Sequence, residues 1–248
     1  MGTILLEESH VFDDAKTKRE VINSLKELNR QVTEWKKLAS KNGQARQISS
    51  IVDNRYQKMF ETAKTMATIL EAQEPYKSGH LFRVADLARQ ISLEMGISPD
   101  RSDGVFMAGL IHDFGMVFIS KKLLGRKRRL SEAELQIMRG HVQVGYEILK
   151  NISFPWPVAR MILEHHERIN GSGYPNGLLG CNTLLESRIL AVADVVDAIT
   201  SARPYRPARE ISVALYEIKG NRNTLYDPDV VDACLTLFHQ KNYSIPDN

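Results

Sequence analysis

Residues 165–175 read His-His-Glu-Arg-Ile-Asn-Gly-Ser-Gly-Tyr-Pro, and this stretch decides how the rest of the chain is interpreted. The two adjacent histidines follow a segment in which apolar residues have helical spacing. Glycines and prolines then gather between residues 171 and 180, which predicts a rigid, turn-rich loop. Five of the seven histidines lie between residues 80 and 166, so we expect the chemistry of the protein to reside in histidine side chains.

The composition excludes several classes of protein. The chain has 248 residues, of which 43% are hydrophobic and 25% are charged, as in an ordinary globular protein. Its formal net charge of +3 requires no surface for DNA or another polyanion. Cys181 and Cys234 lack metal or redox spacing, which favours a reducing compartment over a secreted disulfide scaffold. Without an apolar run of about 18 residues or a signal peptide, we expect a cytoplasmic protein with no membrane span.

Helical periodicity runs through most of the sequence. Apolar residues recur at steps of three and four, and few segments alternate with period two. The pattern predicts an all-α protein without internal repeats. We expect helices at about residues 13–40, 50–70, 78–95, 102–114, 132–150, 157–168, 184–201 and 229–240.

The N-terminal part is expected to differ from the rest. Residues 1–71 form a predicted helical segment with a heptad-like apolar seam, and residues 72–248 form the main domain. One interpretation is a pair of amphipathic helices that pack on each other or on the main domain. The other is a signalling or dimerising segment that supports a homodimer.

Five histidines and two aspartates fall on core-facing positions or at the ends of different predicted helices. Taken alone, each is more readily a buried residue with satisfied hydrogen bonds. Burying all seven in one small core would cost about several kcal/mol for each unpaired group. These groups therefore need partners that satisfy them. Divalent cations satisfy imidazole and carboxylate together, and this donor set suits Fe, Mn, Zn, Co or Ni better than Mg or Ca. The seven candidates are His80, His112, Asp113, His141, His165, His166 and Asp194.

The adjacent pair His112-Asp113 restricts the geometry of such a site. Consecutive side chains point about 100° apart on a helix. Both can reach one site only at a helix end or around a pair of ions. Because a carboxylate has two oxygens, Asp113 could bridge two ions.

These residues belong to motifs that resemble the HD-GYP phosphodiesterases of the HD hydrolase superfamily. The resemblance covers roughly residues 72–240 and is specific, because His-His-Glu followed by Gly-Ser-Gly-Tyr-Pro rarely arises by chance. The first 70 residues do not share it. The matching motifs are Gly79-His80 with Arg83-Val84, His112-Asp113-Phe114-Gly115, His141 with Gly145, residues 165–175, residues 193–198 and residues 201–206.

The resemblance implies an HD-type helical bundle around a di-metal centre that hydrolyses cyclic di-GMP to linear pGpG or GMP. A hydroxide held between the two ions would attack phosphorus, and His112 and Asp113 would be catalytic through the ions that they hold. Fe or Mn is the expected metal, with Ni, Co and Zn as alternatives. By position in the motifs, one ion would be held by His80, His112, Asp113 and Asp194, and the other by Asp113, His141, His165 and His166.

Two ions are expected rather than three. Trinuclear members of the family carry a carboxylate four residues before the first histidine of the motif. That position is Tyr76 in this chain, and Glu74 lies two residues too early.

Two residues depart from the family pattern. Met116 stands where the family usually has a lysine that contacts substrate phosphate, and Asn170 replaces an aspartate. Losing one cation beside the reacting phosphate costs roughly 2–4 kcal/mol of transition-state stabilisation, so activity is expected to be reduced. The alternative function is therefore a weakly active or inactive module that binds cyclic di-GMP or a partner. A nucleotidase acting on another phosphate ester is the third hypothesis.

Basic residues offer candidates for substrate binding. Residues 121–129 carry six basic side chains and form either a solvated charge run or a rim that attracts phosphate. In the second case Arg126 would replace the missing lysine. Arg203 and Arg206 match family positions that contact substrate phosphate.

The loop residues Gly173, Tyr174 and Pro175 complete the resemblance. In the family this motif is linked to contacts with diguanylate cyclase domains, which are therefore candidate partners. The simpler interpretation is a rigid loop that positions the neighbouring elements.

Overall fold

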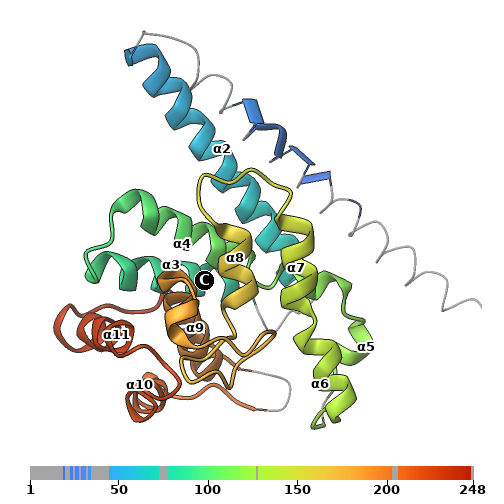
Figure 1. Cartoon of the computed structure of the whole chain (residues 1–248), viewed down its shortest axis with the longest axis vertical. Coiled ribbons are helices and arrows are strands. Elements are labelled where there is room, and N and C mark those ends of the chain that lie inside the picture. Colours follow the sequence, from blue (N-terminus) through green and yellow to red (C-terminus); the bar gives the residue numbers. More distant parts are fainter. Residues whose placement is uncertain are drawn as a thin grey trace, which may run out of the picture.

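The computed structural model describes residues 45–72, 78–126, 128–202 and 206–246, together with scattered helical positions between 19 and 34. Most of the predicted helix at 13–40 lies outside the described residues. The described residues form helices without any β-strand, so the all-α prediction is confirmed (Figure 1). The elements are α2 (Ala45–Glu71), α3 (His80–Glu94), α4 (Pro99–Ile111), η2 (Phe114–Phe118), α5 (Lys121–Leu124), α6 (Glu132–Arg139), α7 (His141–Leu149), α8 (Val158–Glu164), η3 (Gly180–Asn182), α9 (Leu185–Thr200), α10 (Ile211–Gly220) and α11 (Pro228–Gln240).

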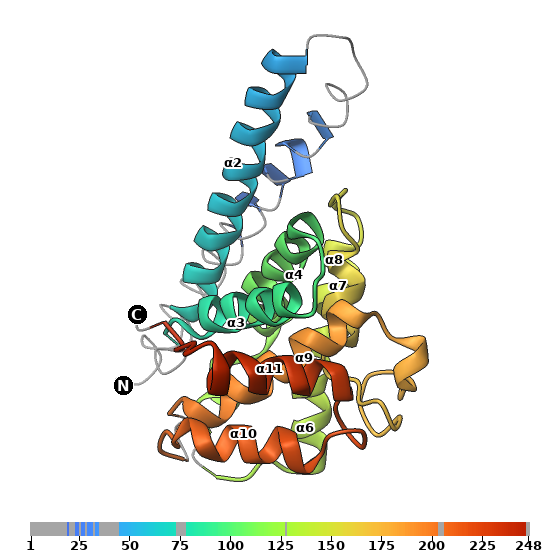
Figure 2. The ribbon, with the colours of Figure 1, turned by 90° about the vertical axis from the view of Figure 1, so that its left-hand side faces the viewer.

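Helices α3, α4 and α9 form the centre of the fold. α3 packs against both α4 and α9, α8 packs against α4 and α9, and α10 and α11 cover the other side of α9 (Figures 1 and 2). Because neighbours surround α9, most of its side chains are buried, including the apolar run from Ile189 to Ala193. A polar side chain on this helix therefore lies in the core unless it reaches a partner or a ligand.

Helix α2 belongs to the same hydrophobic core. Met59, Ala63, Met66 and Leu70 recur at steps of four and three and are all buried in the cluster that includes α3 and α4. Figure 2 shows the N-terminal half of α2 extending beyond α3 and α4. The predicted boundary between residues 71 and 72 thus falls inside one continuous core.

Apart from the short elements η2, α5 and η3, which were not predicted, two regions differ from the predicted helices. The single helix expected at 132–150 is two helices, α6 and α7, which meet at Gly140. Glycine favours such a break because its helix propensity is lower than that of every other residue except proline. The second difference is α10, which was not predicted, although Ile211, Ala214, Leu215 and Ile218 have helical spacing.

The capping signal at residues 131–134 marked the start of α6 correctly. The Ser131 hydroxyl accepts a hydrogen bond from the Glu134 amide, and the Glu134 carboxylate accepts one from the Ser131 amide, which completes the capping box. Among the described residues, no helix combines the length and the apolar character needed to cross a lipid bilayer.

Candidate metal centre

The five histidines reach one centre because four of them lie at helix ends. His80 is the first residue of α3, and His141 is the first residue of α7. His112 and His165 directly follow α4 and α8, and His166 continues the chain after α8. At such an end the chain leaves the helical path, as at Asp113, where φ is −86° and ψ is 13°. This arrangement solves the geometric problem that the pair His112-Asp113 posed.

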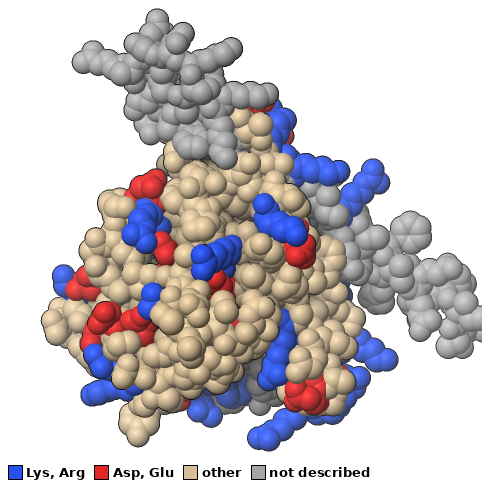
Figure 3. All heavy atoms as spheres, viewed as in Figure 1, with Lys and Arg blue, Asp and Glu red and all other residues tan. Residues whose placement is uncertain are grey.

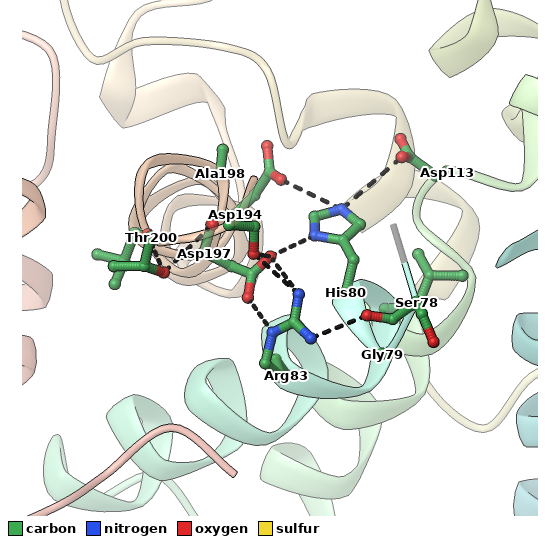
Figure 4. A network of polar contacts seen from close by, with 12 residues as sticks. Ser78, Gly79, His80, Arg83, Asp113, Asp194, Asp197, Ala198 and Thr200 are labelled. Carbon is green, nitrogen blue, oxygen red and sulfur yellow. Dashed lines mark hydrogen bonds and ion pairs between the residues drawn. The ribbon is translucent and has the colours of Figure 1, made fainter. Parts of the chain in front are cut away.

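A first cluster consists of His80, His112 and Asp194, whose potential ligand atoms lie within 4.8 Å of one another. Nε2 of His80 is 3.7 Å from Oδ1 of Asp194, and Nε2 of His112 is 3.8 Å from the same oxygen. Asp113 faces this cluster as well, because its Oδ2 lies 3.9 Å from Nε2 of His80 (Figure 4). The three helices α3, α4 and α9 thus contribute one group each.

A second cluster consists of His141, His165 and His166, again with nitrogen atoms within 4.8 Å of one another. Asp113 joins the two clusters. Its Oδ1 lies 3.4 Å from Nε2 of His141 and 3.7 Å from Nε2 of His112. A carboxylate placed between two groups of imidazoles is suited to bridge two cations.

Hydrogen bonds fix the orientation of four imidazole rings. Nδ1 of His112, His141 and His165 each donates to the carbonyl oxygen three residues earlier, at 2.8, 2.7 and 2.6 Å. Nδ1 of His80 lies 2.6 Å from Oδ2 of Asp197. Since these oxygens can only accept, the proton is on Nδ1, and the Nε2 lone pair of each ring faces the centre.

The buried setting favours the neutral form of His165 and His166. Burial, together with the neighbouring His112 and His141, lowers the pKa of His165 to about 3. Burial and the neighbouring His165 lower the pKa of His166 well below its ordinary value. Burial would raise the pKa of Asp194, but His112 and His80 outweigh it, and the pKa is lowered. Neutral imidazoles beside ionised carboxylates are the protonation states that metal ligands require.

The donor set fits divalent cations. Within the described part of the chain, the buried Nε2 atoms of His112 and His165 have no hydrogen-bond partner. Leaving such atoms unsatisfied costs about 1–3 kcal/mol each, which a bound cation would offset. Imidazole and carboxylate together suit transition metals better than Mg or Ca.

Two residues outside the predicted ligand set position His80. Asp197 receives a hydrogen bond from His80 and a 2.6 Å hydrogen bond from Nε of Arg83 (Figure 4). Burial would raise the pKa of Asp197, but these hydrogen bonds hold it at about 2. The sequence contained a signal for this role, because Asp194 and Asp197 lie three residues apart on one helix and so share a face.

Glu71, the last residue of α2, holds the start of α3. Its carboxylate accepts hydrogen bonds from the amides of Gly79 and Leu81 at 2.7 and 2.8 Å. These amides belong to the helix end that presents His80, and Gly79 has φ of 70°, which favours glycine. Sequence spacing gave no indication of this contact because eight residues separate Glu71 from Gly79.

The loop after the paired histidines is held against the second cluster. Glu167 accepts hydrogen bonds from the amides of Asn176 and Leu178 at 2.8 and 2.9 Å. A Cβ on Gly173 would lie 2.4 Å from the Arg168 amide nitrogen, so the close approach requires glycine. The Tyr174 ring then lies 4.7 Å from the His166 ring, while Pro175 follows it in the chain.

Asn170, the second departure from the family pattern, has a local role in this loop. Its side-chain oxygen accepts hydrogen bonds from the amide and the hydroxyl of Ser172, at 3.0 and 2.6 Å. The residue therefore stabilises the turn that leads into Gly173.

Met116 does not lie open beside the centre. It is 8% exposed and packs with Ile119, Leu123 and Met138 in a small apolar cluster beside the main core. Methionine at this position therefore stabilises the packing of η2 and α5.

The predicted phosphate-binding arginines have other partners in this conformation. Arg126 forms an ion pair with Glu134 at 3.4 Å. Arg206 donates from its guanidinium to the carbonyl oxygens of Ala198 and Ile199 near the end of α9. Arg203, Tyr76 and Glu74 lie outside the described residues.

The charge distribution agrees with the composition. On the face drawn in Figure 3, basic and acidic side chains lie close to one another and do not form a large area of one sign.

Comparisons with known proteins agree with this geometry. The sequence pattern of the HD domain family matches residues 46–230. A cyclic di-GMP phosphodiesterase response regulator, RpfG of Xanthomonas campestris, is 38% identical over 177 residues, which are 71% of this chain and 47% of that protein. A 3'3'-cGAMP-specific phosphodiesterase of Vibrio cholerae is 35% identical over 178 residues, 72% of this chain and 38% of that protein. The chain thus spans less than half the length of these two relatives.

Solved structures give the same result. An HD-GYP-type protein of Bdellovibrio bacteriovorus, Bd1817, superposes with a TM-score of 0.58 at 17% identity over 75% of this chain and 64% of that one, which supports the fold. The V. cholerae cyclic GMP-AMP phosphodiesterase V-cGAP3 superposes with a TM-score of 0.50 at 28% identity over 77% of this chain and 43% of that one. With the family pattern spanning most of the chain and the motif histidines gathered at helix ends, this chain belongs to the HD domain family, in its HD-GYP branch.

Proposed function

We propose that the chain hydrolyses a phosphodiester bond of a cyclic dinucleotide with the help of two divalent transition-metal ions. The observation that carries this proposal is the pair of clusters joined by Asp113. Support also comes from relatives that bear the names of cyclic di-GMP and cGAMP phosphodiesterases. HD phosphodiesterases as a family use divalent metals, and we propose Fe or Mn here, since both accept mixed imidazole and carboxylate ligands.

Each ion is assigned a ligand set. The first set is His80, His112, Asp113 and Asp194, and the second is Asp113, His141, His165 and His166. Bound there, a pair of divalent ions supplies Lewis acidity toward a phosphodiester and lowers the pKa of water. The protein contributes rigidity, because backbone carbonyls and Asp197 lock the ring orientations.

Cyclic di-GMP is the substrate that we propose, with linear pGpG or GMP as the product. A cyclic dinucleotide also fits a cytoplasmic signalling enzyme, which was the expectation from composition. Diguanylate cyclase domains at residues 173–175 and a homodimer through the N-terminal segment remain predictions.

A second candidate function is binding without efficient turnover. The observation that favours it is Met116, which provides η2 with an apolar side chain where the family usually has a cation. In that case the chain would bind a cyclic dinucleotide and act as a signalling element.

One experiment tests the proposal and separates the two candidates. The protein is purified anaerobically, reconstituted with Fe(II) or Mn(II), and examined by elemental analysis and by a turnover assay with cyclic di-GMP, 3'3'-cGAMP and a nucleoside monophosphate. About two ions per chain and hydrolysis of a cyclic dinucleotide are expected. Two bound ions without turnover would favour the binding module. Failure to bind metal would contradict both.

The shared ligand provides a sharper test of the assignment. Asp113→Ala should remove both ions, because it breaks both ligand sets, whereas His141→Ala should weaken only the second site. Elemental analysis across a series of metal concentrations measures both effects. Equal, slight losses in the two variants would contradict the bridging role of Asp113.

A further inference from the structure

A cyclic dinucleotide carries two phosphodiester groups, and only one can lie at the metal ions during reaction. The other retains a full negative charge and needs a cation or water. Of the arginines expected from the sequence, Arg126 pairs with Glu134 and Arg206 binds backbone carbonyls, while Arg203 lies outside the described residues. Among the described residues, a different cationic side chain is therefore needed to bind the second phosphodiester group.

Arg139 lies next to the second cluster. It ends α6 and stands two residues before His141. Its guanidinium carbon is 5.5 Å from the centroid of the Tyr174 ring, and that ring lies 4.7 Å from the ring of His166. The guanidinium, the tyrosine and the candidate ligand thus form a continuous stack at the rim of the centre.

The guanidinium of Arg139 is only weakly engaged. The contact that the structure records with an acid is 3.4 Å from Glu132, whose side chain is 72% exposed. Exposed pairs of this kind contribute about 0–1 kcal/mol and are easily exchanged for a better partner. By contrast, Arg83 is bound to the buried Asp197, and Arg168 donates to the carbonyl oxygen of Glu167.

The apolar cluster that contains Met116 contacts the residue that precedes Arg139. Met138 packs against the apolar cluster of Met116, Ile119 and Leu123. Because Met138 is adjacent to Arg139, this packing holds the end of α6 against the cluster. Lysine at position 116 would not extend the apolar cluster in the same way.

We propose that Arg139 binds the phosphodiester group of the substrate that does not react, with Tyr174 holding the guanidinium plane. A planar guanidinium offers two parallel N–H donors to a phosphate, and stacking on an aromatic ring leaves its edge free for them. The inference rests on the proposed function. It makes Arg139 a substrate-binding residue and gives the chain a cation that Met116 does not supply.

The test compares two substrates. Cyclic di-GMP has two phosphodiesters, whereas bis(p-nitrophenyl) phosphate has one and reacts at the same ions. Arg139→Gln should raise KM for cyclic di-GMP about 10- to 100-fold, the size expected for losing hydrogen bonds to a charged group, with a much smaller change in kcat. It should leave kcat/KM for bis(p-nitrophenyl) phosphate within about twofold of wild type. The KM of Arg139→Lys for cyclic di-GMP should lie between the values for wild type and for Arg139→Gln.

Arg222→Gln is the matched control. Arg222 has the same side-chain exposure as Arg139, 42%, and pairs with an exposed acid, Asp232, at the surface. Loss of the Arg222 guanidinium should change neither KM nor kcat for either substrate. Elemental analysis and thermal unfolding should show the same metal content and stability for all the variants as for wild type.

Binding without turnover separates this inference from the proposed function. Isothermal titration with the hydrolysis-resistant bisphosphorothioate analogue of cyclic di-GMP should show the same 10- to 100-fold loss of affinity, about that predicted for KM, in Arg139→Gln. If wild type binds the analogue but hydrolyses neither substrate, the proposed function fails, and an affinity loss still supports the role of Arg139. Unchanged analogue affinity in Arg139→Gln, or equal losses with both substrates, would overturn it.

Discussion

Asp197 binds no ion in the proposed arrangement, but it fixes the ring of a residue that does. Asp197→Asn should weaken the first metal site about 10- to 100-fold, because the neutral amide holds His80 less strongly and no longer pairs with Arg83. Metal titration monitored by isothermal calorimetry measures the loss. Asp232→Asn, which removes a surface carboxylate, is the control. A first site with unchanged affinity in Asp197→Asn would show that His80 needs no anchor.

Met116 should matter for stability. Met116→Lys places an ammonium group among Ile119, Leu123 and Met138, and we expect a loss of at least about 2 kcal/mol in the free energy of unfolding. Met116→Leu conserves volume and should cost less than about 1.5 kcal/mol. Urea unfolding monitored by circular dichroism distinguishes the two. Equal stability of both variants would mean that the side chain at 116 turns outward with little cost.

The sequence indicated candidate ligands that the structure brings close together, but it indicated little of the residues that support them. His80, His112 and Asp194 could be found because polar residues on apolar stripes stand out within a few turns of helix. Asp197 shares a helix face with Asp194, but its contact with His80 joins residues 117 positions apart, and no local pattern encodes that contact. Glu71 reaches Gly79 across the connection between α2 and α3, which helical spacing does not encode either. Arg206 matched a family motif, but its conformation depends on where α9 ends.

At the scale of the elements, the backbones of η2 and α7 approach each other closely at Gly115. A Cβ on Gly115 would lie 1.9 Å from the carbonyl oxygen of His141 and 2.9 Å from the amide nitrogen of Gly145, and both are backbone atoms. Gly115→Ala should therefore shift α7, lower the free energy of unfolding by about 1–3 kcal/mol, and weaken the second metal site. Thermal unfolding and metal titration test this.

Gly220→Ala is the control for this substitution. No atom lies within 4 Å of the position that a Cβ would take at Gly220, and this glycine ends a helix. The control should therefore unfold like wild type. If Gly115→Ala also unfolds like wild type and retains the second site, α7 can move away without cost.

The break at Gly140 and helix α10, both missed by the sequence interpretation, have different causes. The break at Gly140 needed a choice between a continuous helix and two short ones, and packing of α7 against η2 and α8 decides it. The helical spacing of apolar residues in α10 was present in the sequence, but Pro204 and Pro207, just before it, favour a loop. Packing against α9 and α11 then stabilises a helix of ten residues.

At the scale of the whole molecule, α2 decides where the folding unit begins. Removing residues 1–71 would delete Met59, Met66 and Leu70 from the core and expose the apolar surfaces of α3 and α4 that α2 covers. Each of the three side chains is worth about 1.5–3 kcal/mol of burial, against a total stability of about 5–15 kcal/mol. We expect this truncation to be insoluble or unfolded, whereas removal of residues 1–44 should retain the fold and the metal content. Circular dichroism and elemental analysis measure both. A cooperative unfolding transition of residues 72–248 at the wild-type temperature would contradict the expectation.

The hydrogen bonds from Gly79 and Leu81 to Glu71 have a consequence for how the length of this chain can change in evolution. One residue inserted into α2 between Met59 and Glu71 would turn the Glu71 side chain by about 100° and advance it by about 1.5 Å. Either the buried face of α2 or the support of His80 would then be lost. Insertions and deletions should therefore be tolerated before the buried part of α2 and excluded within it. The number of residues between Met59 and Glu71 is fixed by contacts at both ends of this stretch.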